Sequence, residues 1–145
     1  MSAFTSSQWM AFGREKLEQQ AFSRLLGAEL TSLTAGRVQL ELPLRADLLQ
    51  QHGFAHGGVV SYLADNALTY AGGTALAEPH GAVTSEFKIN YVRPAVGERL
   101  IARAEALTAG RSQAVCRCDV FAVKDGEEKL CAVAQGTIVA MSEKG

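Results

Sequence analysis

Residues 56–77, with the sequence HGGVVSYLADNALTYAGGTALA, decide the fold of this chain. His56 and two glycines come first, and small or apolar side chains then occupy nearly every position. The run predicts one long helix from Gly57 to about Ala77, roughly 30 Å in length at 1.5 Å per residue. Its apolar residues fall on every side: Val59, Val60, Leu63, Ala64, Ala67, Leu68, Ala71, Ala75 and Leu76. We therefore expect a helix that is buried all round rather than amphipathic.

The segments before and after this helix alternate in the way that strands do. We expect strands in the ranges 28–33, 37–42, 83–91, 99–108, 114–124 and 129–141. Pro43 ends the second of them, while Gly110 and the segment 124–126 mark turns between later ones. In 83–91, strict alternation puts Val83, Phe87, Ile89 and Tyr91 on one face and Thr84, Glu86, Lys88 and Asn90 on the other.

One face of the last three strands carries small residues. They are Ala102, Ala104, Ala106, Ala114, Cys116, Cys118, Ala122, Ala132, Ala134 and Gly136. Small side chains let a sheet approach a buried helix closely. The pattern therefore predicts an α+β architecture, in which a five- or six-stranded antiparallel sheet wraps one central helix.

An additional helix is expected at the N-terminus, over residues 7–26. Ser6 or Ser7 can cap its start, and Gly27 can end it. Its apolar stripe is only moderately periodic and consists of Trp9, Phe12, Leu17, Phe22 and Leu25.

Composition restricts the classes of function. The 145 residues suit one domain, residues 1–145, and 14 basic against 15 acidic side chains argue against a nucleic-acid partner. The polar N-terminus does not resemble a secretory signal, and no apolar run approaches the roughly 20 residues that span a membrane. Three cysteines are an odd number, which favours buried thiols in a reducing cytoplasm.

Asp65 is the strongest candidate for chemistry, since an unpaired carboxylate is costly inside an apolar helix. A structural carboxylate bonded to a neighbouring hydroxyl is the alternative. Gly57 and Gly58 begin the helix, where free amides and the helix dipole suit an oxyanion. Asp65 is eight residues after Gly57, or roughly 12 Å along the helix. If both act on one carbonyl, they must come from different chains of a two-fold dimer.

These residues carry a resemblance to a known family. The stretch 56–67 (HGGVVSYLADNA) is similar to the motif of the hotdog-fold acyl-CoA thioesterases. More narrowly, it resembles the branch of the phenylacetate-pathway (PaaI-like) enzymes and human thioesterase superfamily member 2. The likeness continues through 84–95 (TSEFKINYVRPA) and Gly110-Arg111-Ser112, and it covers about Leu40 to the C-terminus. It implies a helix-in-sheet fold and a homodimer, or a dimer of dimers (homotetramer).

The resemblance also implies roles for individual residues. Gly57 matches the glycine whose amide polarises the thioester carbonyl, and Asp65 matches the carboxylate that acts as general base or nucleophile. Thr84 matches a hydroxyl that helps hold the water. Gln50 stands where many relatives have asparagine, and Gln51 is the alternative to it. The predicted substrate-binding residues are His56 and Gly58 in the turn, Arg111 near the nucleotide end of coenzyme A, and Tyr62, which can line an acyl pocket or fill a core or dimer contact.

The sequence thus predicts a cytoplasmic acyl-CoA thioesterase acting on aryl or short- to medium-chain substrates. It needs no metal and no cofactor, because coenzyme A arrives as part of the substrate. His52, His56 and His80 lack metal-ligand spacing, and Cys116 with Cys118 lacks a second pair. Two other classes stay open. A hotdog hydratase or dehydratase would need a histidine with an acid near the reacting carbons, and a non-catalytic acyl-CoA-binding module would need no water-activating acid.

Overall fold

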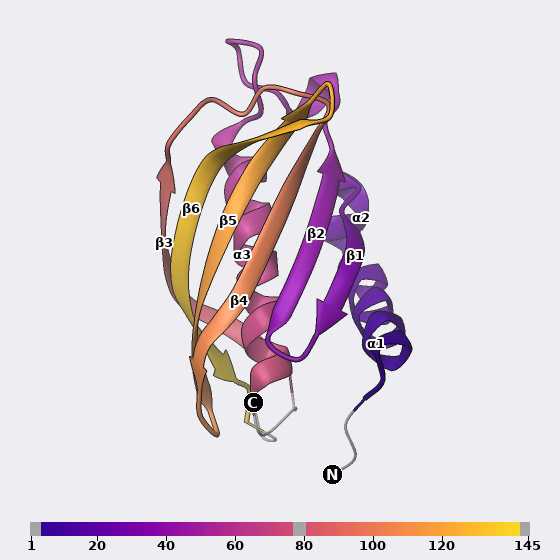
Figure 1. Ribbon diagram of the computed structural model, residues 1–145, viewed down its shortest axis with the longest axis vertical. Helices are drawn as coiled ribbons and strands as arrows, with labels where there is room; N and C mark the ends of the chain where they lie inside the picture. Colours follow the sequence, from indigo (N-terminus) through magenta and orange to yellow (C-terminus); the bar gives the residue numbers. More distant parts are fainter. Residues whose placement is uncertain (1–3, 77–80, 143–145) are drawn as a thin grey trace.

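A single curved sheet packs around one side of one long helix in the computed structural model, which describes residues 4–76 and 81–142 (Figure 1). The helix is α3 (Gly57–Ala75), and the six strands lie in the order β1-β2-β4-β5-β6-β3, all antiparallel. Their bounds are β1 Glu29–Thr34, β2 Arg37–Pro43, β3 Ala82–Tyr91, β4 Arg99–Ala109, β5 Gln113–Lys124 and β6 Glu127–Ala140. A short 3-10 helix, η1 (Ala46–Leu48), precedes α3. The predicted α+β architecture is confirmed; the predicted helix end at Ala77 lies outside the described residues.

Small residues on the inner face of the sheet allow the helix to sit close to it. The predicted stripe is buried except for Ala106, which is partly buried, and its members Ala102, Cys116 and Ala132 are fully covered. The closest approach is at Gly72, where an added Cβ would lie 2.5 Å from the Cβ of Ile138. A larger residue at this position would push α3 away from β6, because real Cβ atoms do not come so near.

The helix is not buried all round, contrary to the prediction. Leu63, Ala64, Ala67, Leu68 and Ala71 are fully buried against the sheet. Ser61, Asp65 and Thr69, which follow one another at intervals of four residues, are only partly buried. The sheet curves around one side of α3 (Figure 1), so the opposite side keeps a partly open strip. The sequence pattern did not reveal this strip, because small residues lie along it.

Strand β3 also departs from the predicted alternation. Its pairing with β6 shifts between Thr84 and Glu86, a β-bulge at Ser85. Thr84 pairs with the fully buried Ile138 and so lies on the inner face together with Phe87, not on the opposite face. The extra residue moves the side chains that precede it in β3 to the opposite face of the sheet. Thr84 therefore points toward α3.

The N-terminal segment forms two helices instead of one. They are α1 (Ser6–Gln19), with Thr5 rather than Ser6 or Ser7 as its N-cap, and α2 (Ala21–Leu26). Gln20 separates them because its backbone is extended. Gly27 ends α2 with a φ of 88°, as predicted for a terminal glycine. The predicted apolar stripe is wrong at its end, since Phe22 and Leu25 are 57% and 66% exposed.

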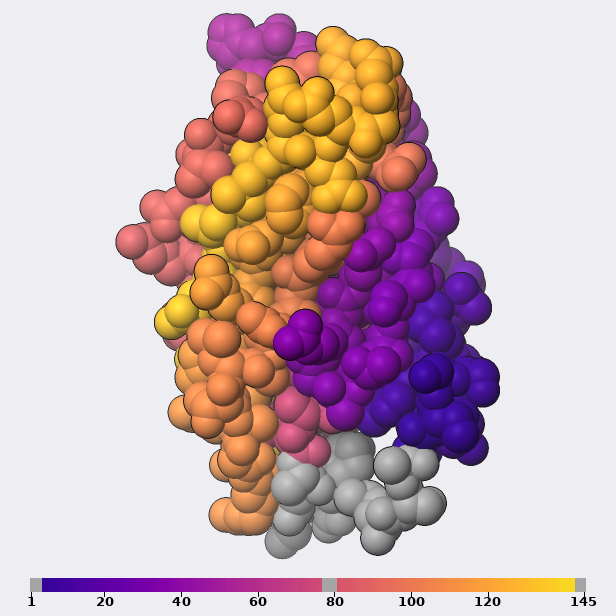
Figure 2. Space-filling model, in the orientation of Figure 1, coloured from indigo at the N-terminus to yellow at the C-terminus, as the bar shows by residue number. Residues whose placement is uncertain are grey.

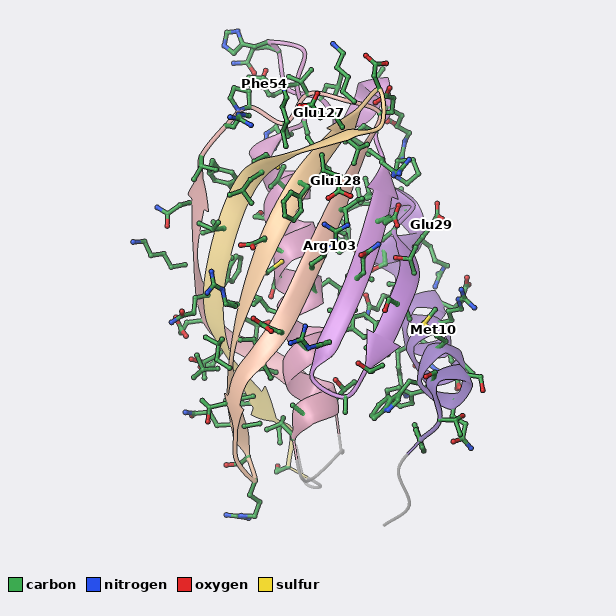
Figure 3. All side chains as sticks on the ribbon, in the orientation of Figure 1. Met10, Glu29, Phe54, Arg103, Glu127 and Glu128 are labelled. Atoms are coloured by element: carbon green, nitrogen blue, oxygen red, sulfur yellow. The ribbon has the colours of Figure 1, made fainter. Side chains whose placement is uncertain are left out.

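The outer face of the sheet carries polar side chains that pair with one another. Figure 2 shows this face, over which the described residues place no helix. Arg103 of β4 reaches Glu128 of β6 through two hydrogen bonds of 2.7 and 2.9 Å, and Figure 3 shows the two side chains together. Arg103 also lies over the Phe121 ring of β5, 5.1 Å from its centroid. Exposed pairs of this kind stabilise weakly, by about 0–1 kcal/mol.

No helix within residues 4–76 and 81–142 combines the length and apolar character needed to cross a bilayer.

Candidate active site

A carboxylate and a hydroxyl meet on the open strip of α3. Thr84 donates a hydrogen bond of 2.6 Å from Oγ1 to Oδ1 of Asp65. Thr69, one turn further along α3, lies with its Oγ1 2.9 Å from Thr84 Oγ1 and donates to the backbone carbonyl of Asp65 at 2.9 Å. Asp65 remains partly exposed, so the carboxylate is oriented by its neighbours but still accessible.

The two hydroxyl groups cannot supply every contact at once. Three contacts join Asp65, Thr69 and Thr84, and each threonine has one proton to donate. With Asp65 ionised, Thr84 gives its proton to the carboxylate, since a hydrogen bond to a charged acceptor is the stronger one. Thr69 then divides its proton between the helix carbonyl and Thr84. Only one carboxylate oxygen is engaged within the described residues, and Oδ2 is left to accept a proton from water.

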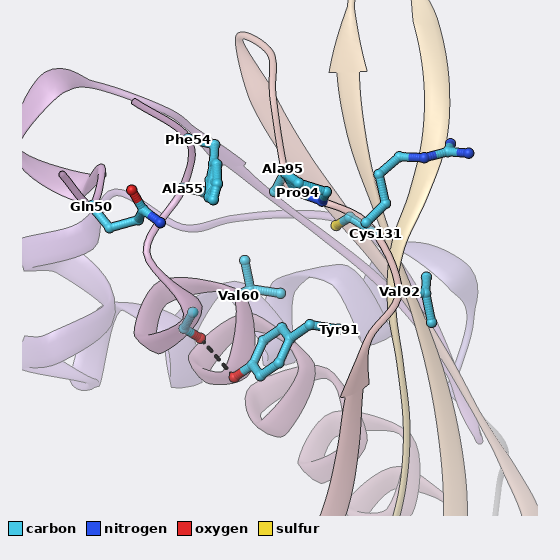
Figure 4. Close-up of a pocket in the computed structure, with 11 residues that line it drawn as sticks. Gln50, Phe54, Ala55, Val60, Tyr91, Val92, Pro94, Ala95 and Cys131 are labelled. Carbon is cyan, nitrogen blue, oxygen red and sulfur yellow. Dashed lines mark hydrogen bonds between the residues drawn. The ribbon is translucent and has the colours of Figure 1, made fainter. Parts of the chain in front are cut away.

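A second group of candidate residues surrounds the start of α3. His56 is the N-cap, and its Nδ1 accepts the amide proton of Gly58 at 2.8 Å. In this contact Nδ1 is the acceptor, which leaves Nε2 as the ring nitrogen that can donate. Tyr91, from the end of β3, donates to the carbonyl of Gly57 at 3.0 Å (Figure 4). The Gly57 amide has no acceptor within the described part of the chain, as expected for the first residue of a helix.

A pocket of about 370 Å³ opens beside this free amide (Figure 4). Gln50, Gly57, Val60, Tyr91 and Arg93 are among its lining residues. Gln50 accepts the His52 amide through Oε1. Its side-chain NH₂ is thus the group left for a ligand, and it can donate to a carbonyl oxygen or to water. Gln51 is exposed in the loop and does not line the pocket.

The predicted residues therefore fall into two sets rather than one. Gln50, His56, Gly57 and Gly58 lie at the start of α3, whereas Asp65 lies eight residues later, about 12 Å along the helix axis. Asp65 is not among the residues that line the Gly57 pocket. Within one chain, the free amide and the carboxylate do not face a common centre.

Two further predicted residues lie apart from both sets. The hydroxyl of Tyr62 is 2.5 Å from Ser23 Oγ and accepts from Asn66 Nδ2 at 3.2 Å, and burial raises the pKa of Tyr62. Its ring packs edge-on against Phe22. Arg111 is exposed in the turn between β4 and β5, at the opposite end of the molecule from the start of α3 (Figure 1).

Sequence reasoning missed Thr69 and the hydroxyl of Tyr91. Thr69 is four residues after Asp65, and this spacing puts both on one helix face. The sequence could therefore have indicated that Thr69 lies beside Asp65. Tyr91 was assigned to a face of its strand, but its bond to Gly57 depends on how α3 docks against β3, which no local pattern specifies.

Metal ligation and thiol chemistry find little support. Residues 4–76 and 81–142 contain no group of three His, Cys, Asp or Glu side chains placed to hold a metal ion, and His80 lies outside them. The three cysteines are buried free thiols. Burial raises the pKa of Cys116 and of Cys131 to about 11, so neither is a ready nucleophile near neutral pH.

Comparison with known proteins identifies the family. Residues 52–129 match the model of the thioesterase superfamily, and the chain belongs to that superfamily and has its hotdog fold. It is accordingly a thioester hydrolase of the PaaI-like group. A putative esterase of Saccharolobus solfataricus is 31% identical over 129 residues, covering 89% of this chain and 83% of the relative. The acyl-coenzyme A thioesterase PaaI of Escherichia coli is 30% identical over 99 residues, 68% of this chain and 69% of PaaI.

Solved structures agree with this assignment. A thioesterase family protein from Silicibacter pomeroyi is 40% identical, with a TM-score of 0.84 over 88% of this chain and 94% of that one. The E. coli PaaI protein from the phenylacetic acid degradation operon is 25% identical, with a TM-score of 0.82 over 94% of this chain and 96% of that one.

Proposed function

We propose that this protein is an acyl-CoA thioesterase that hydrolyses aryl or short- to medium-chain acyl-CoA to the free acid and coenzyme A. One observation carries the proposal: the Asp65 carboxylate is held by the Thr84 hydroxyl at 2.6 Å on the open strip of α3. A thioester needs a polarised carbonyl and an activated nucleophile, and its thiolate leaves without a strong acid. The similarity to E. coli PaaI supports coenzyme A as the thiol. No cofactor or metal is required.

The active site is proposed to form between two chains. Strand β3 is an edge of the sheet, with one side free to pair with another strand. Its first half contacts Asp65 through Thr84, and its last residue contacts Gly57 through Tyr91. If two β3 edges pair antiparallel about a two-fold axis, the Tyr91 end of one chain comes beside the Thr84 end of the other. The free amide and the carboxylate would then face one centre, twice per dimer.

In the proposed mechanism the Gly57 amide of one chain donates a hydrogen bond to the carbonyl oxygen of the thioester. Asp65 of the other chain removes a proton from water, and the water oxygen bonds to the acyl carbon. The carbon–sulfur bond then breaks, and the proton passes to the leaving thiolate. Thr84 orients the carboxylate, and the NH₂ of Gln50 donates to the carbonyl or the water. Direct attack by Asp65 is the alternative, in which water hydrolyses the resulting anhydride.

The remaining predicted residues have supporting roles in this proposal. His56 and Gly58 fix the turn that leaves the Gly57 amide free. The two-fold relation would carry Arg111 toward the partner's Gly57 pocket, where its charge suits the phosphates of coenzyme A. Tyr62 would border the acyl side of the centre. A homodimer or a dimer of dimers in the cytoplasm completes the proposal, and the three free thiols support a reducing compartment.

The test is thiol release from phenylacetyl-, benzoyl-, hexanoyl- and decanoyl-CoA by the wild type and by Asp65→Asn. The asparagine variant keeps the shape of the side chain and loses the carboxylate. We expect turnover by the wild type and a fall of about 100-fold or more in kcat for the variant, the scale of a lost general base. Binding of acyl-CoA without thiol release would instead indicate a non-catalytic binding module, and equal rates of thiol release for the two proteins would show that Asp65 is structural.

A further inference from the structure

A second pocket, of about 260 Å³, begins one helical turn beyond Asp65. We propose that it holds the acyl group of the substrate, and that the N-terminal helix α1 sets the size of the acyl group accepted. This inference rests on the proposed thioesterase function and specifies its substrate class as aryl or medium-length apolar acyl groups. Its walls come from α1, from the second half of α3 and from the start of β3, with Met141 at the end of β6.

A row of side chains of decreasing size leads from the carboxylate into this pocket. Asp65, Thr69 and Gly73 follow one another at intervals of four residues and therefore lie along one face of α3. On the facing strand, Thr84 contacts the first two. Ala82 lies opposite Gly73, so close that a Cβ on residue 73 would be 3.2 Å from its own. The helix and the strand are thus in close contact here, and Gly73 and Ala82 both line the pocket beside this contact.

Several polar groups around the pocket already have hydrogen-bond partners. The Tyr70 hydroxyl donates to the Gly13 carbonyl at 2.7 Å, so Tyr70 presents mainly its ring. The Asn66 amide donates to Gln20 Oε1 at 3.0 Å. Among residues 4–76 and 81–142, no acidic side chain lines the pocket. An apolar acyl group would leave these hydrogen bonds undisturbed.

Helix α1 supplies a wall of the pocket that lies outside the segment matched by the family model. Phe12 and Lys16 line the pocket, and the Lys16 Nζ lies 5.5 Å from the centroid of the Phe12 ring. Both residues precede the segment 52–129 that matches the family model. A flat aromatic wall suits an aryl group or an extended alkyl chain. The size limit is thus assigned to a part of this chain outside the matched catalytic segment.

Two variants test the assignment in opposite directions. Ala82→Leu adds bulk to the lining of the pocket, and Phe12→Ala removes one of its walls. The measured quantity is the ratio of kcat/KM for decanoyl-CoA to that for acetyl-CoA. We expect Ala82→Leu to lower this ratio at least 10-fold, on the scale of one or two methylenes excluded from a pocket. We expect Phe12→Ala to raise it. Matched controls are Val83→Leu, on the opposite face of β3, and Leu25→Ala, on the exposed side of α2; neither should change the ratio.

Unchanged ratios in both pocket variants, with circular dichroism showing native folds, would overturn the inference while leaving the thioesterase function intact. A wild type that hydrolyses none of the substrates would overturn the proposed function instead. In that case calorimetric affinities for decanoyl-CoA and free coenzyme A would still test the pocket. Ala82→Leu should then weaken binding of decanoyl-CoA alone, and an equal loss for both ligands would refute the assignment.

Discussion

The substitution Gly57→Pro tests the proposed oxyanion donor more selectively than any side-chain change. Gly57 is the first residue of α3, a position where proline is well tolerated because its missing N–H has no partner in the helix. The preceding residue, His56, has φ −61° and ψ 139°, a conformation that a following proline favours. The change therefore deletes one amide proton and leaves the helix in place. Loss of one oxyanion donor costs about 100- to 1,000-fold in kcat, or about 2.7–4 kcal/mol.

Gly57→Ala is the matched control for this experiment. It adds the same Cβ, which would lie 3.4 Å from the nearest Tyr91 ring atom, an ordinary contact, and it keeps the N–H. Thiol release with phenylacetyl-CoA gives kcat and KM, and urea unfolding checks that both variants are stable. We expect the alanine variant to retain most of the activity and the proline variant to lose it mainly in kcat. A proline variant as active as the alanine variant would refute the role of the Gly57 amide.

Three further outcomes are expected. Thr84→Val should lower kcat about 10- to 100-fold, because a hydrogen bond to a charged group is worth about 1.5–3 kcal/mol, while Thr84→Ser should keep most of the activity; steady-state kinetics of the pair would show equal rates if the hydroxyl did not matter. Gly136→Ala should lower stability by about 1–3 kcal/mol and reduce activity, since its Cβ would lie 2.6 Å from the Glu86 carbonyl at the bulge; urea unfolding measures the first effect, and an unaltered midpoint would contradict the account. Burial raises the pKa values of Cys116 and Cys131 from 9.0 to about 11, so these thiols lose their protons at a lower pH in the unfolded chain than in the folded one. The free energy of unfolding should therefore fall as pH rises from 9.0 toward about 11. Urea unfolding midpoints measured across this range would instead stay level if the thiols ionised freely in the native state.

The architecture could be predicted because several independent patterns agree on it. A helix as apolar as 57–75 must be covered over most of its surface, and alternating strands that carry alanine and cysteine on one face can pack closely against it. Strand boundaries moved by one or two residues, as expected where hydrogen bonding frays at the ends of elements. The helix-starting histidine and glycine pair also marked the correct first residue of α3.

The predictions that were wrong share one physical cause. Contacts between distant parts of the chain determined the conformation there, rather than the local sequence pattern. The bulge at Ser85 cannot be inferred from alternation, yet it turns Thr84 toward Asp65. The break at Gln20 likewise reflects contacts made across the fold. Its extended backbone reorients α2, and its Oε1 accepts from Ser23 and Asn66.

The separation of Gly57 from Asp65 was predictable by arithmetic alone, because the rise of a helix is fixed. The environment of each residue was not. Whether Asp65 had a hydroxyl partner, and which one, depended on the register of β3 against β6 and on the docking of α3. Candidate residues could thus be named from the sequence, while their grouping into two sets needed the structure.

The central claim, that each active site combines two chains, is tested most directly by mixing two inactive variants. Gly57→Pro and Asp65→Asn are each expected to be nearly inactive as homodimers. In a mixed dimer, one site receives an intact Gly57 from one chain and an intact Asp65 from the other. Co-expression at equal levels should therefore restore about a quarter of the wild-type activity, since about half of the dimers are mixed and each has one intact site. Activity no greater than that of the separate variants, in samples shown by affinity tags to contain mixed dimers, would contradict the account and place both groups in one chain.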